Sequence, residues 1–300
     1  MNLHHDKEAF GELIVGAANE LAIPTNVIEK DYYVTMILKQ LAERSDLCVF
    51  KGGTSLSKCF HAIDRFSEDI DITFTEHLGE SRRKRLKYKI LKPISDELRM
   101  EIINWNQIES DKDYNCYLFS YVPVGKYTTD VIKPEVKLET ALASYAFPTE
   151  LRLLGSYVYD FLKIENNDIA EEYHLQPFEM RVQSLNRTFI DKIFALCDYY
   201  MQGKSKRYSR HLYDLFKLRN RICFDDEIKD LVREVREHRK GMSICPSAQE
   251  SVDIVALVNE FCDNDFYKSD YESITEYFVT ESIEYDRAIA NIREIVDLLF

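Results

Sequence analysis

The sequence predicts an α+β protein whose strands lie in the first part of the chain and whose last part is helical. Short apolar runs and strictly alternating runs, the patterns of buried and half-buried strands, occur between residues 46 and 140. Helical periodicity precedes them and dominates again past residue 185. A polar, irregular stretch at 165–180 separates the two regions. We therefore expect one domain over residues 1–175 and a mainly helical domain over residues 176–300.

The elements are expected in the following order. Residues 6–22 and 25–43 have the apolar spacing of helices and are separated by Pro24. Residues 46–50 form an apolar run that ends at Lys51-Gly52-Gly53, the pattern of a strand entering a tight turn, and apolar spacing predicts a helix from there to Ile63. Residues 69–74, 115–122 and 134–140 are expected strands, and residues 81–104 an expected helix.

Composition and charge exclude several classes of protein. The chain has 300 residues, 45% of them hydrophobic, which is enough for a sizeable core. Its seven cysteines form no CxxC pair, so we expect a reducing cytoplasm rather than a disulfide framework or zinc site. We expect neither secretion nor membrane insertion, because no signal-peptide pattern and no run of roughly 18 apolar residues occurs.

The net charge of -13 argues against a surface that coats nucleic acid indiscriminately. Two basic runs, residues 81–89 and 203–211, stand out against this background. The simpler interpretation is a solvated helix face and a loop. The alternative is that they form a local positive region that guides a nucleic-acid acceptor by its phosphates.

Asp69 and Asp71 are the first candidate site residues. Strand residues two apart project to the same face, so both carboxylates are expected on one side while Ile70 and Ile72 enter the core. A divalent cation between them would relieve their repulsion. Mg²⁺ is favoured because it binds one or two carboxylates together with substrate phosphates. An exposed edge strand whose acids face water is the alternative.

The glycine turn upstream predicts an anion site. Gly52 and Gly53 leave room for a ligand close to the backbone, and a following helix would point free amide hydrogens at the turn. Thr54 and Ser55 add hydroxyl donors, and Lys58 lies one helical turn further on the same side. A phosphate-binding turn followed by an acid pair describes the two halves of a nucleoside triphosphate site.

These two motifs, GGTSLSK and SEDIDI, resemble the signature of the polymerase β type nucleotidyltransferase superfamily. The resemblance implies a mixed sheet with N-terminal helices and a helical C-terminal domain, and a third carboxylate on a later strand. Glu135 and Glu139 are the candidates, and both share a strand face with Lys137. We favour Glu139 as a metal ligand or general base. The alternative is an ordinary strand face of alternating charge.

Within that superfamily the chain resembles the AbiEii/AbiGii nucleotidyltransferase toxins, the toxic half of type IV toxin-antitoxin systems. The resemblance is carried by IEKDYYVTMIL (28–38), FKGGTSLSK (50–58), SEDIDI (67–72), SLNRTFIDKIFAL (184–196) and YSRHLYDL (208–215). It implies transfer of a nucleotide from an NTP, in studied members onto the 3′ end of tRNA. Arg210-His211 stands where many members have Arg-Asp.

The resemblance also implies roles for individual residues. Ser67 would contact the γ-phosphate, and Lys192 would contact the nucleotide while an ion pair with Asp214 steadies it. A purely structural ion pair between packed helices is the alternative. EKDYY suggests no chemistry beyond anchoring the N-terminal helices. The triphosphate-binding residues would be Gly52, Gly53, Thr54 and Ser55, with Lys58 beside them, and the metal ligands Asp69 and Asp71.

We therefore predict a cytoplasmic, Mg²⁺- or Mn²⁺-dependent nucleotidyltransferase toxin that uses an NTP and a tRNA or other RNA acceptor, with a cognate antitoxin as a possible partner and no membrane association. One alternative is an NTP-dependent transferase acting on protein or on its own Ser67. Another is a non-catalytic nucleotide-binding protein that acts through its helical portion.

Overall fold

The structure, a computed structural model, describes residues 1–65, 67–125, 132–165, 167–275 and 281–300. The chain divides into two compact units, one of Met1–Cys59 with Glu68–Val182 and one of Phe60–Ser67 with Gln183–Phe300. These units differ from the predicted domains, because the short segment Phe60–Ser67 joins the second unit and the division after it falls at 182 rather than 175.

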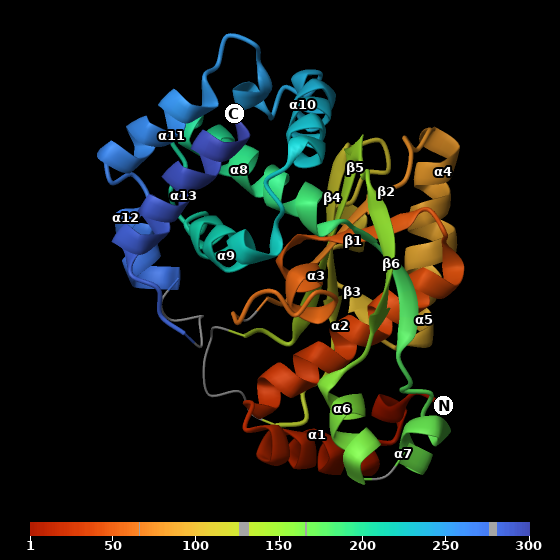
Figure 1. Cartoon of the computed structure of the whole chain (residues 1–300). Helices are drawn as coiled ribbons and strands as arrows, with labels where there is room; N and C mark the ends of the chain where they lie inside the picture. The colour runs from red at the N-terminus through yellow and green to blue at the C-terminus, as the bar shows by residue number, and fades with distance from the viewer. Residues whose placement is uncertain (66, 126–131, 166, 276–280) are drawn as a thin grey trace. The chain divides into compact units, whose positions relative to one another are not determined.

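The first unit is built on a seven-stranded mixed sheet with the order β3-β4-β5-β2-β1-β7-β6 (Figure 1). The predicted α+β class with a mixed sheet is confirmed. β1 runs parallel to β7 and β2 parallel to β5, while β1-β2, β3-β4 and β4-β5 are antiparallel. The strands are β1 (Cys48–Lys51), β2 (Ile70–Phe74), β3 (Glu101–Ile102), β4 (Tyr114–Ser120), β5 (Glu135–Tyr145), β6 (Thr149–Leu154) and β7 (Phe178–Gln183).

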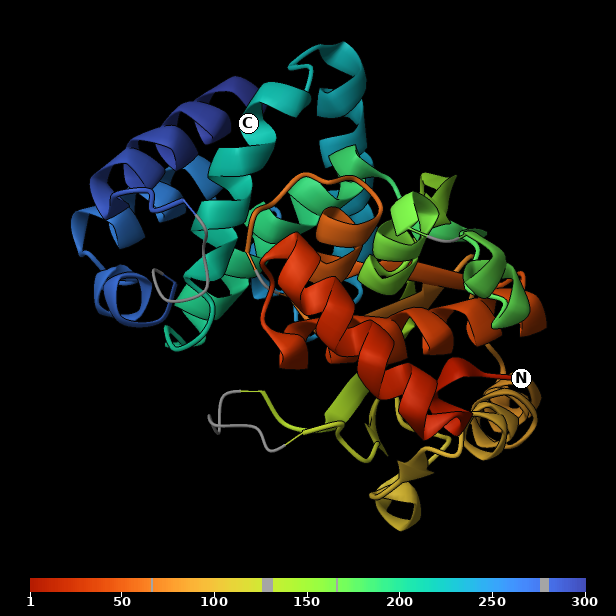
Figure 2. The same ribbon diagram turned by 90° about the horizontal axis from the view of Figure 1, so that it is seen from below.

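The helices of this unit pack against one another and against the sheet. Figure 2 shows α1 and α2 from below, where α1 packs against α2 and α6. α2 also contacts β5. The helical elements are η1 (Leu3–His5), α1 (Lys7–Leu21), α2 (Thr25–Arg44), α3 (Gly52–Lys58), α4 (Glu80–Arg85), η2 (Leu86–Leu91), α5 (Lys92–Glu97), η3 (Trp105–Gln107), α6 (Tyr157–Glu165) and α7 (Asn167–Glu172).

The central strands bury one face and leave the other partly accessible. In β5, Val136, Leu138 and Leu142 are buried, whereas the residues between them are half-exposed. β4 follows the same alternation, with Tyr117 and Phe119 in the core. Polar side chains at the alternate positions therefore gather on a single, accessible face of the sheet.

Two helices end earlier than their apolar spacing predicts. α3 ends at Lys58 instead of continuing to Ile63, because the next residues are bound within the second unit: Arg221 donates to the carbonyls of Phe60 and His61. Tertiary contacts thus override helical periodicity. The helix expected to reach 104 ends at α5, and Arg99, with φ 50°, turns the chain into β3.

The second unit is helical, as the sequence predicts. α8 contacts α9, α10 and α11, and α13 contacts α9, α10 and α11. Asp198 on α8 is a buried anchor that accepts hydrogen bonds from Ser247 N, Ser247 Oγ and Arg239. The elements are α8 (Leu185–Met201), α9 (Arg210–Leu218), η4 (Arg219–Arg221), α10 (Asp226–Lys240), η5 (Pro246–Ala248), α11 (Ile254–Asp263), α12 (Lys268–Asp270), η6 (Tyr271–Thr275) and α13 (Tyr285–Leu299).

All seven cysteine side chains are free thiols. Within the described ranges, none of the helices combines the length and apolarity that crossing a membrane requires.

A half-buried histidine near the start of the chain predicts loss of stability in acid. His4 Nε2 lies 2.9 Å from the Leu98 carbonyl and His4 Nδ1 lies 2.8 Å from the Tyr32 hydroxyl, and burial lowers the pKa of His4 to about 4. The unfolded chain, with a pKa near 6.5, therefore takes up the proton first, and stability present above that pH is lost as pH falls toward 4.

We expect the free energy of unfolding to fall by about 2 kcal/mol through this group between about pH 7 and pH 5. Urea denaturation of the wild type and His4→Asn at both pH values measures the effect, with the variant losing less stability than the wild type. Equal losses in the two proteins would contradict the assignment to His4.

Candidate active site

Gly52 lies directly against the carboxylate of Asp71. Lys51, the last residue of β1, pairs with Asp71 on β2, so the turn begins next to this aspartate. Gly52 has φ +81°, a conformation that residues with a Cβ rarely adopt. A Cβ atom at this position would also lie 1.9 Å from Asp71 Oδ2. The glycine turn and the acidic strand are therefore parts of one site.

Asp71 is paired in register with Glu139. The two residues are Cα partners in the parallel β2-β5 pair, so their side chains leave the same face of the sheet. Glu135, the other candidate for the third carboxylate, is the first residue of β5, where it is paired with Ser120 of β4. The register thus brings Glu139, and not Glu135, beside Asp71.

The thiol of Cys116 reports on the charge of this face. Cys116 is the Cα partner of Glu139 across the β4-β5 pair. Burial raises the pKa of Cys116 to about 11. The negative charges of Glu139 and Asp69 add to this shift, and the positive charge of Lys137 opposes it. Asp69 immediately precedes β2, and alternation directs it to the side of Asp71. Asp69, Asp71 and Glu139 are therefore expected to converge on one face.

Tyr114 is a site residue that the sequence did not indicate. Its ring is 54% exposed, and its phenol hydrogen-bonds to Glu139. Partial burial of Tyr114 raises its pKa, and the negative charges of Glu139 and, more weakly, Asp71 raise it further. The phenol therefore stays protonated and remains a hydrogen-bond donor. Only the strand register could have identified it, because Tyr114 lies 25 residues before Glu139 in the chain.

The carboxylates suit a hard divalent cation, which prefers oxygen ligands. In the parts of the chain that the structure describes, no group of three His, Cys, Asp or Glu side chains is already arranged around a metal position. Mg²⁺ needs no such protein cage when one or two carboxylates hold it together with substrate phosphates. Asp69 and Asp71 therefore fit an ion that is bound with a nucleotide.

The polar side chains of the turn helix are already engaged within the protein. Ser55 is fully buried and its Oγ donates to the Gly52 carbonyl at 2.9 Å, and Thr54 is also buried. Lys58 forms a salt bridge with Asp31 on α2. The other Asp31 oxygen accepts from Tyr157 N at 2.9 Å, so Asp31 holds Lys58 and the start of α6 together.

The EKDYY segment of α2 does more than anchor the N-terminal helices. Glu29, Lys30 and Asp31 are all buried. Glu29 Oε1 accepts from Val124 N, and Lys30 Nζ donates to the Lys133 carbonyl at 3.1 Å. Lys30 Nζ also lies 2.9 Å from Glu68 Oε2, in an ion pair without hydrogen-bond geometry. The charges of α2 thus hold Lys58 and the residue next to Asp69.

In the second unit, Asp214 binds two cations. Lys192 Nζ lies 2.7 Å from Asp214 Oδ2, which is the expected pairing across two helices. Arg65, which the sequence did not single out, binds both carboxylate oxygens at 2.6 and 2.8 Å. Burial alone would raise the pKa of Asp214, but Arg65 and Lys192 outweigh it and hold this pKa well below its usual range.

Burial acts against positive charge on the two basic side chains beside Asp214 in the second unit. It lowers the pKa of Lys192, against the attraction of Asp214. Burial and the neighbouring Lys192 also lower the pKa of His211, whose Nδ1 lies 3.4 Å from Lys192 Nζ, so His211 is neutral. The ion pair with Asp214 is therefore the interaction that favours the charged form of Lys192.

The predicted site residues are divided between the two compact units. Ser67 belongs to the second unit with Lys192 and Asp214. The remaining members belong to the first unit, and they are Gly52, Gly53, Thr54, Ser55, Lys58, Asp69, Asp71 and Glu139.

Comparison with known proteins assigns the chain to a class. A family model described as nucleotidyl transferase AbiEii toxin of type IV toxin-antitoxin systems matches residues 37–291. Among solved structures, the nucleotidyltransferase toxin MenT4 of Mycobacterium tuberculosis is similar with a TM-score of 0.51 and 15% sequence identity, over 96% of this chain and 89% of that chain. This likeness concerns the fold. A search of curated proteins finds no match.

Gly52→Ala tests the close approach to Asp71, and Gly203→Ala is its matched control. Both glycines have positive φ, but a Cβ at Gly203 would meet no described atom within 4 Å. We expect Gly203→Ala to lower the free energy of unfolding by about 1 kcal/mol through backbone strain. Gly52→Ala should lower it by about 2 kcal/mol more, because the Asp71 side chain must also be displaced. Equal losses by chemical denaturation would show that the contact is unimportant.

Proposed function

This chain belongs to the AbiEii family of nucleotidyltransferase toxins of type IV toxin-antitoxin systems, and we propose that it transfers a nucleotide from an NTP to a hydroxyl of an RNA acceptor such as the 3′ end of tRNA. Asp69 and Asp71 would hold Mg²⁺ or Mn²⁺. The observation that carries the proposal is the juxtaposition of Asp71 with Glu139 on one side and with the Gly52 turn on the other.

The chemistry is divided among residues of the first unit. A bound metal ion supplies stabilisation of the negative charge that develops on the transferred phosphate. Glu139 accepts the proton of the attacking hydroxyl, whose oxygen bonds to the α-phosphorus as the bond to pyrophosphate breaks. Tyr114 is a positioning residue in this scheme, because its hydrogen bond orients the Glu139 carboxylate.

The phosphates of the NTP would be bound by the turn and by cations. The residues assigned to the turn are Gly52, Gly53, Thr54 and Ser55, with Lys58 and Ser67. Because the hydroxyl of Ser55 is bonded to Gly52, the contribution of Ser55 is assigned to its backbone N–H. Lys192 is assigned to the nucleotide anion, and its ion pair with Asp214, which also binds Arg65, supports this assignment by fixing the position of the lysine.

The setting of the reaction is part of the same proposal. We assign an antitoxin protein as a partner and the cytoplasm as the compartment. The seven free thiols support a reducing environment.

Asp71→Asn, Asp69→Asn and Glu139→Gln should each reduce nucleotide transfer by at least about 100-fold, because they remove the metal ligands or the base. Glu135→Gln is the matched control on the same strand and should keep near wild-type activity. The assay incubates each protein with labelled NTPs, Mg²⁺ or Mn²⁺ and total bacterial tRNA.

Label transfer that survives Asp71→Asn would refute the metal assignment, and a Glu135→Gln variant as impaired as Glu139→Gln would refute the choice of base. The mass of the labelled product separates an RNA acceptor from a protein acceptor, including Ser67 of the chain itself. Label found only on protein would refute the RNA acceptor while leaving the carboxylates in place.

Lys30→Met tests whether α2 positions the acids through Glu68. We expect roughly tenfold lower kcat and a higher Mg²⁺ concentration for half-maximal activity, because Glu68 loses its buried counter-ion next to Asp69. Lys39→Met, on the same helix, removes only a half-exposed contact to the His174 carbonyl and should change neither quantity. A loss of thermal stability with unchanged kcat and Mg²⁺ dependence would indicate a purely structural role for Lys30.

A further inference from the structure

Two aromatic rings near the β3 edge of the sheet are held in place by a buried lysine. Tyr88 and Trp105 meet edge to face with ring centroids 5.7 Å apart. Lys87, only 5% exposed, donates to the Ile108 carbonyl at 2.6 Å, and its Nζ lies 4.7 Å from the Trp105 ring and 5.3 Å from the Tyr88 ring. Tyr88 nevertheless remains 52% exposed. The pair is therefore a fixed aromatic platform that solvent reaches.

The cations of the basic run 81–89 are not equally available. Arg82, Arg83 and Lys84 form ion pairs with Glu76, Asp113 and Glu80, respectively. Arg85 and Lys89 are exposed and form no ion pair with the residues that the structure describes. Both belong to the helical stretch that carries Tyr88, Arg85 three residues before it and Lys89 directly after it.

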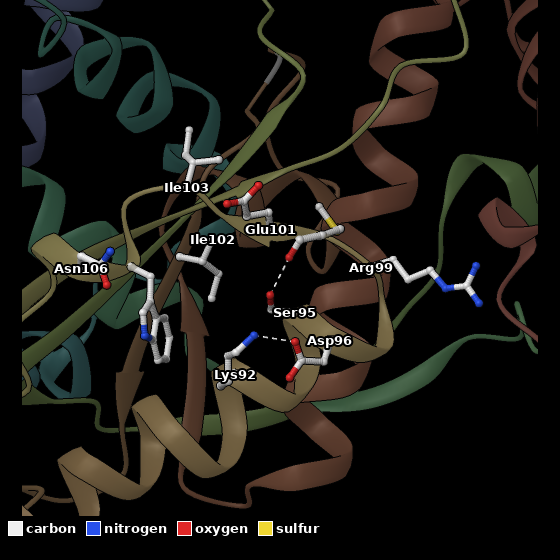
Figure 3. A pocket seen from close by; sticks show the side chains of 10 residues that line it. Lys92, Ser95, Asp96, Arg99, Glu101, Ile102, Ile103 and Asn106 are labelled. Carbon is white, nitrogen blue, oxygen red and sulfur yellow. Dashed lines mark hydrogen bonds and ion pairs between the residues drawn. The ribbon is translucent and has the colours of Figure 1, made fainter.

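Trp105 also belongs to the wall of a pocket of about 530 Å³. Figure 3 shows this pocket from close by. Lys92 pairs with Asp96 at 2.5 Å in this pocket. The Arg99 side chain extends away from that pair, and the carboxylate of Glu101 belongs to the same wall (Figure 3). The pocket therefore adds a hollow at Trp105 whose charged wall residues balance, two cations against two carboxylates.

We propose that Arg85, Tyr88, Lys89 and Trp105, here called the aromatic-basic surface, bind single-stranded RNA. A base would stack on the platform or enter the pocket, while Arg85 and Lys89 contact phosphates. Exposed aromatic rings flanked by free cations are the combination that single-stranded nucleic acids require. On a chain of net charge -13, free cations beside such rings favour a polyanion over an acidic or apolar peptide.

This inference rests on the proposed function for its choice of RNA, and it adds how the acceptor is held. β3 is separated from β5, the strand of Glu139, only by β4. Tyr88 interacts electrostatically with Tyr117, which β4 directs to the buried face of the sheet, whereas Cys116 and Glu139 lie on the opposite, accessible face. An RNA strand bound at the platform would therefore pass around the β3 edge of the sheet to reach the carboxylates. The basic run 81–89, for which a solvated helix face was the simpler interpretation, would then bind a specific ligand.

Trp105 is the single tryptophan of the chain, so its fluorescence reports on this surface directly. Titration with a short single-stranded RNA, without NTP or metal, should quench the emission of Trp105. Tyr88→Ala should weaken binding roughly tenfold through lost stacking and lost support of Trp105. Binding detected by the anisotropy of labelled RNA with no change in Trp105 emission at saturation would overturn the proposal.

Arg85→Glu combined with Lys89→Glu tests the cations. The slope of the logarithm of affinity against the logarithm of salt concentration should fall by about 0.7 for each cation removed. Lys163→Glu combined with Arg233→Glu replaces an exposed lysine and arginine elsewhere with the same change in net charge, and should leave this slope unchanged. Equal effects of the two double variants would mean that only net charge matters, and the surface would be wrong.

Two further variants separate this inference from the proposed function. Asp71→Asn should bind RNA with wild-type affinity although it transfers no nucleotide. Trp105→Phe should retain affinity by anisotropy, whereas Trp105→Ala should lose it. RNA binding without transfer to any acceptor would refute the function and leave the surface standing. RNA transfer with unchanged affinity and KM in the Arg85→Glu and Lys89→Glu protein would refute the surface alone.

Discussion

The contact between Gly52 and Asp71 is the constraint on which the site in the first unit depends. The pairing of Lys51 with Asp71 brings the end of β1 against the aspartate, so the chain can turn there only with φ +81° and without a side chain. The same strand pairing sets Asp71 beside Glu139 through β5. The registers of β1 with β2 and of β2 with β5 therefore place the glycine turn, Asp71 and Glu139 next to one another.

The buried charges of α2 are the second constraint. Ionised side chains inside a protein are costly unless each finds a partner, and a buried pair is weak evidence for stability. Glu29, Lys30 and Asp31 each have a partner on another segment of the chain. Their effect is to specify where Glu68 and Lys58 lie. The matched family range begins at residue 37, after all three of them.

Local pattern predicted what depends on neighbours in the chain, and it failed where distant segments decide. Alternation predicted the strand faces of β2 and β5, and the motifs predicted the pairing of Lys192 with Asp214 that the structure contains. The sequence did not indicate that Arg65 binds Asp214, because 149 residues separate the two. Tyr114 and the preference for Glu139 over Glu135 follow from register, in which a one-residue slip reverses every side chain. The short α3 reflects contacts of Phe60 that no local propensity encodes.

The distribution of cations extends this argument from geometry to ligands. Only about half of the lysines and arginines that the structure describes form ion pairs with carboxylates, so an unpaired cation is informative only where a second feature, such as an exposed ring, accompanies it. Arg65 and Lys192 share one carboxylate inside the second unit, whereas Arg85 and Lys89 stand exposed beside aromatic rings. A buried cation that a carboxylate holds in place suits a compact anion such as a triphosphate, because low dielectric strengthens the attraction. Exposed cations beside rings on which bases can stack suit a flexible polyanion. Salt weakens the binding of such a polyanion. The two settings therefore favour the two anionic substrates that nucleotide transfer to RNA requires.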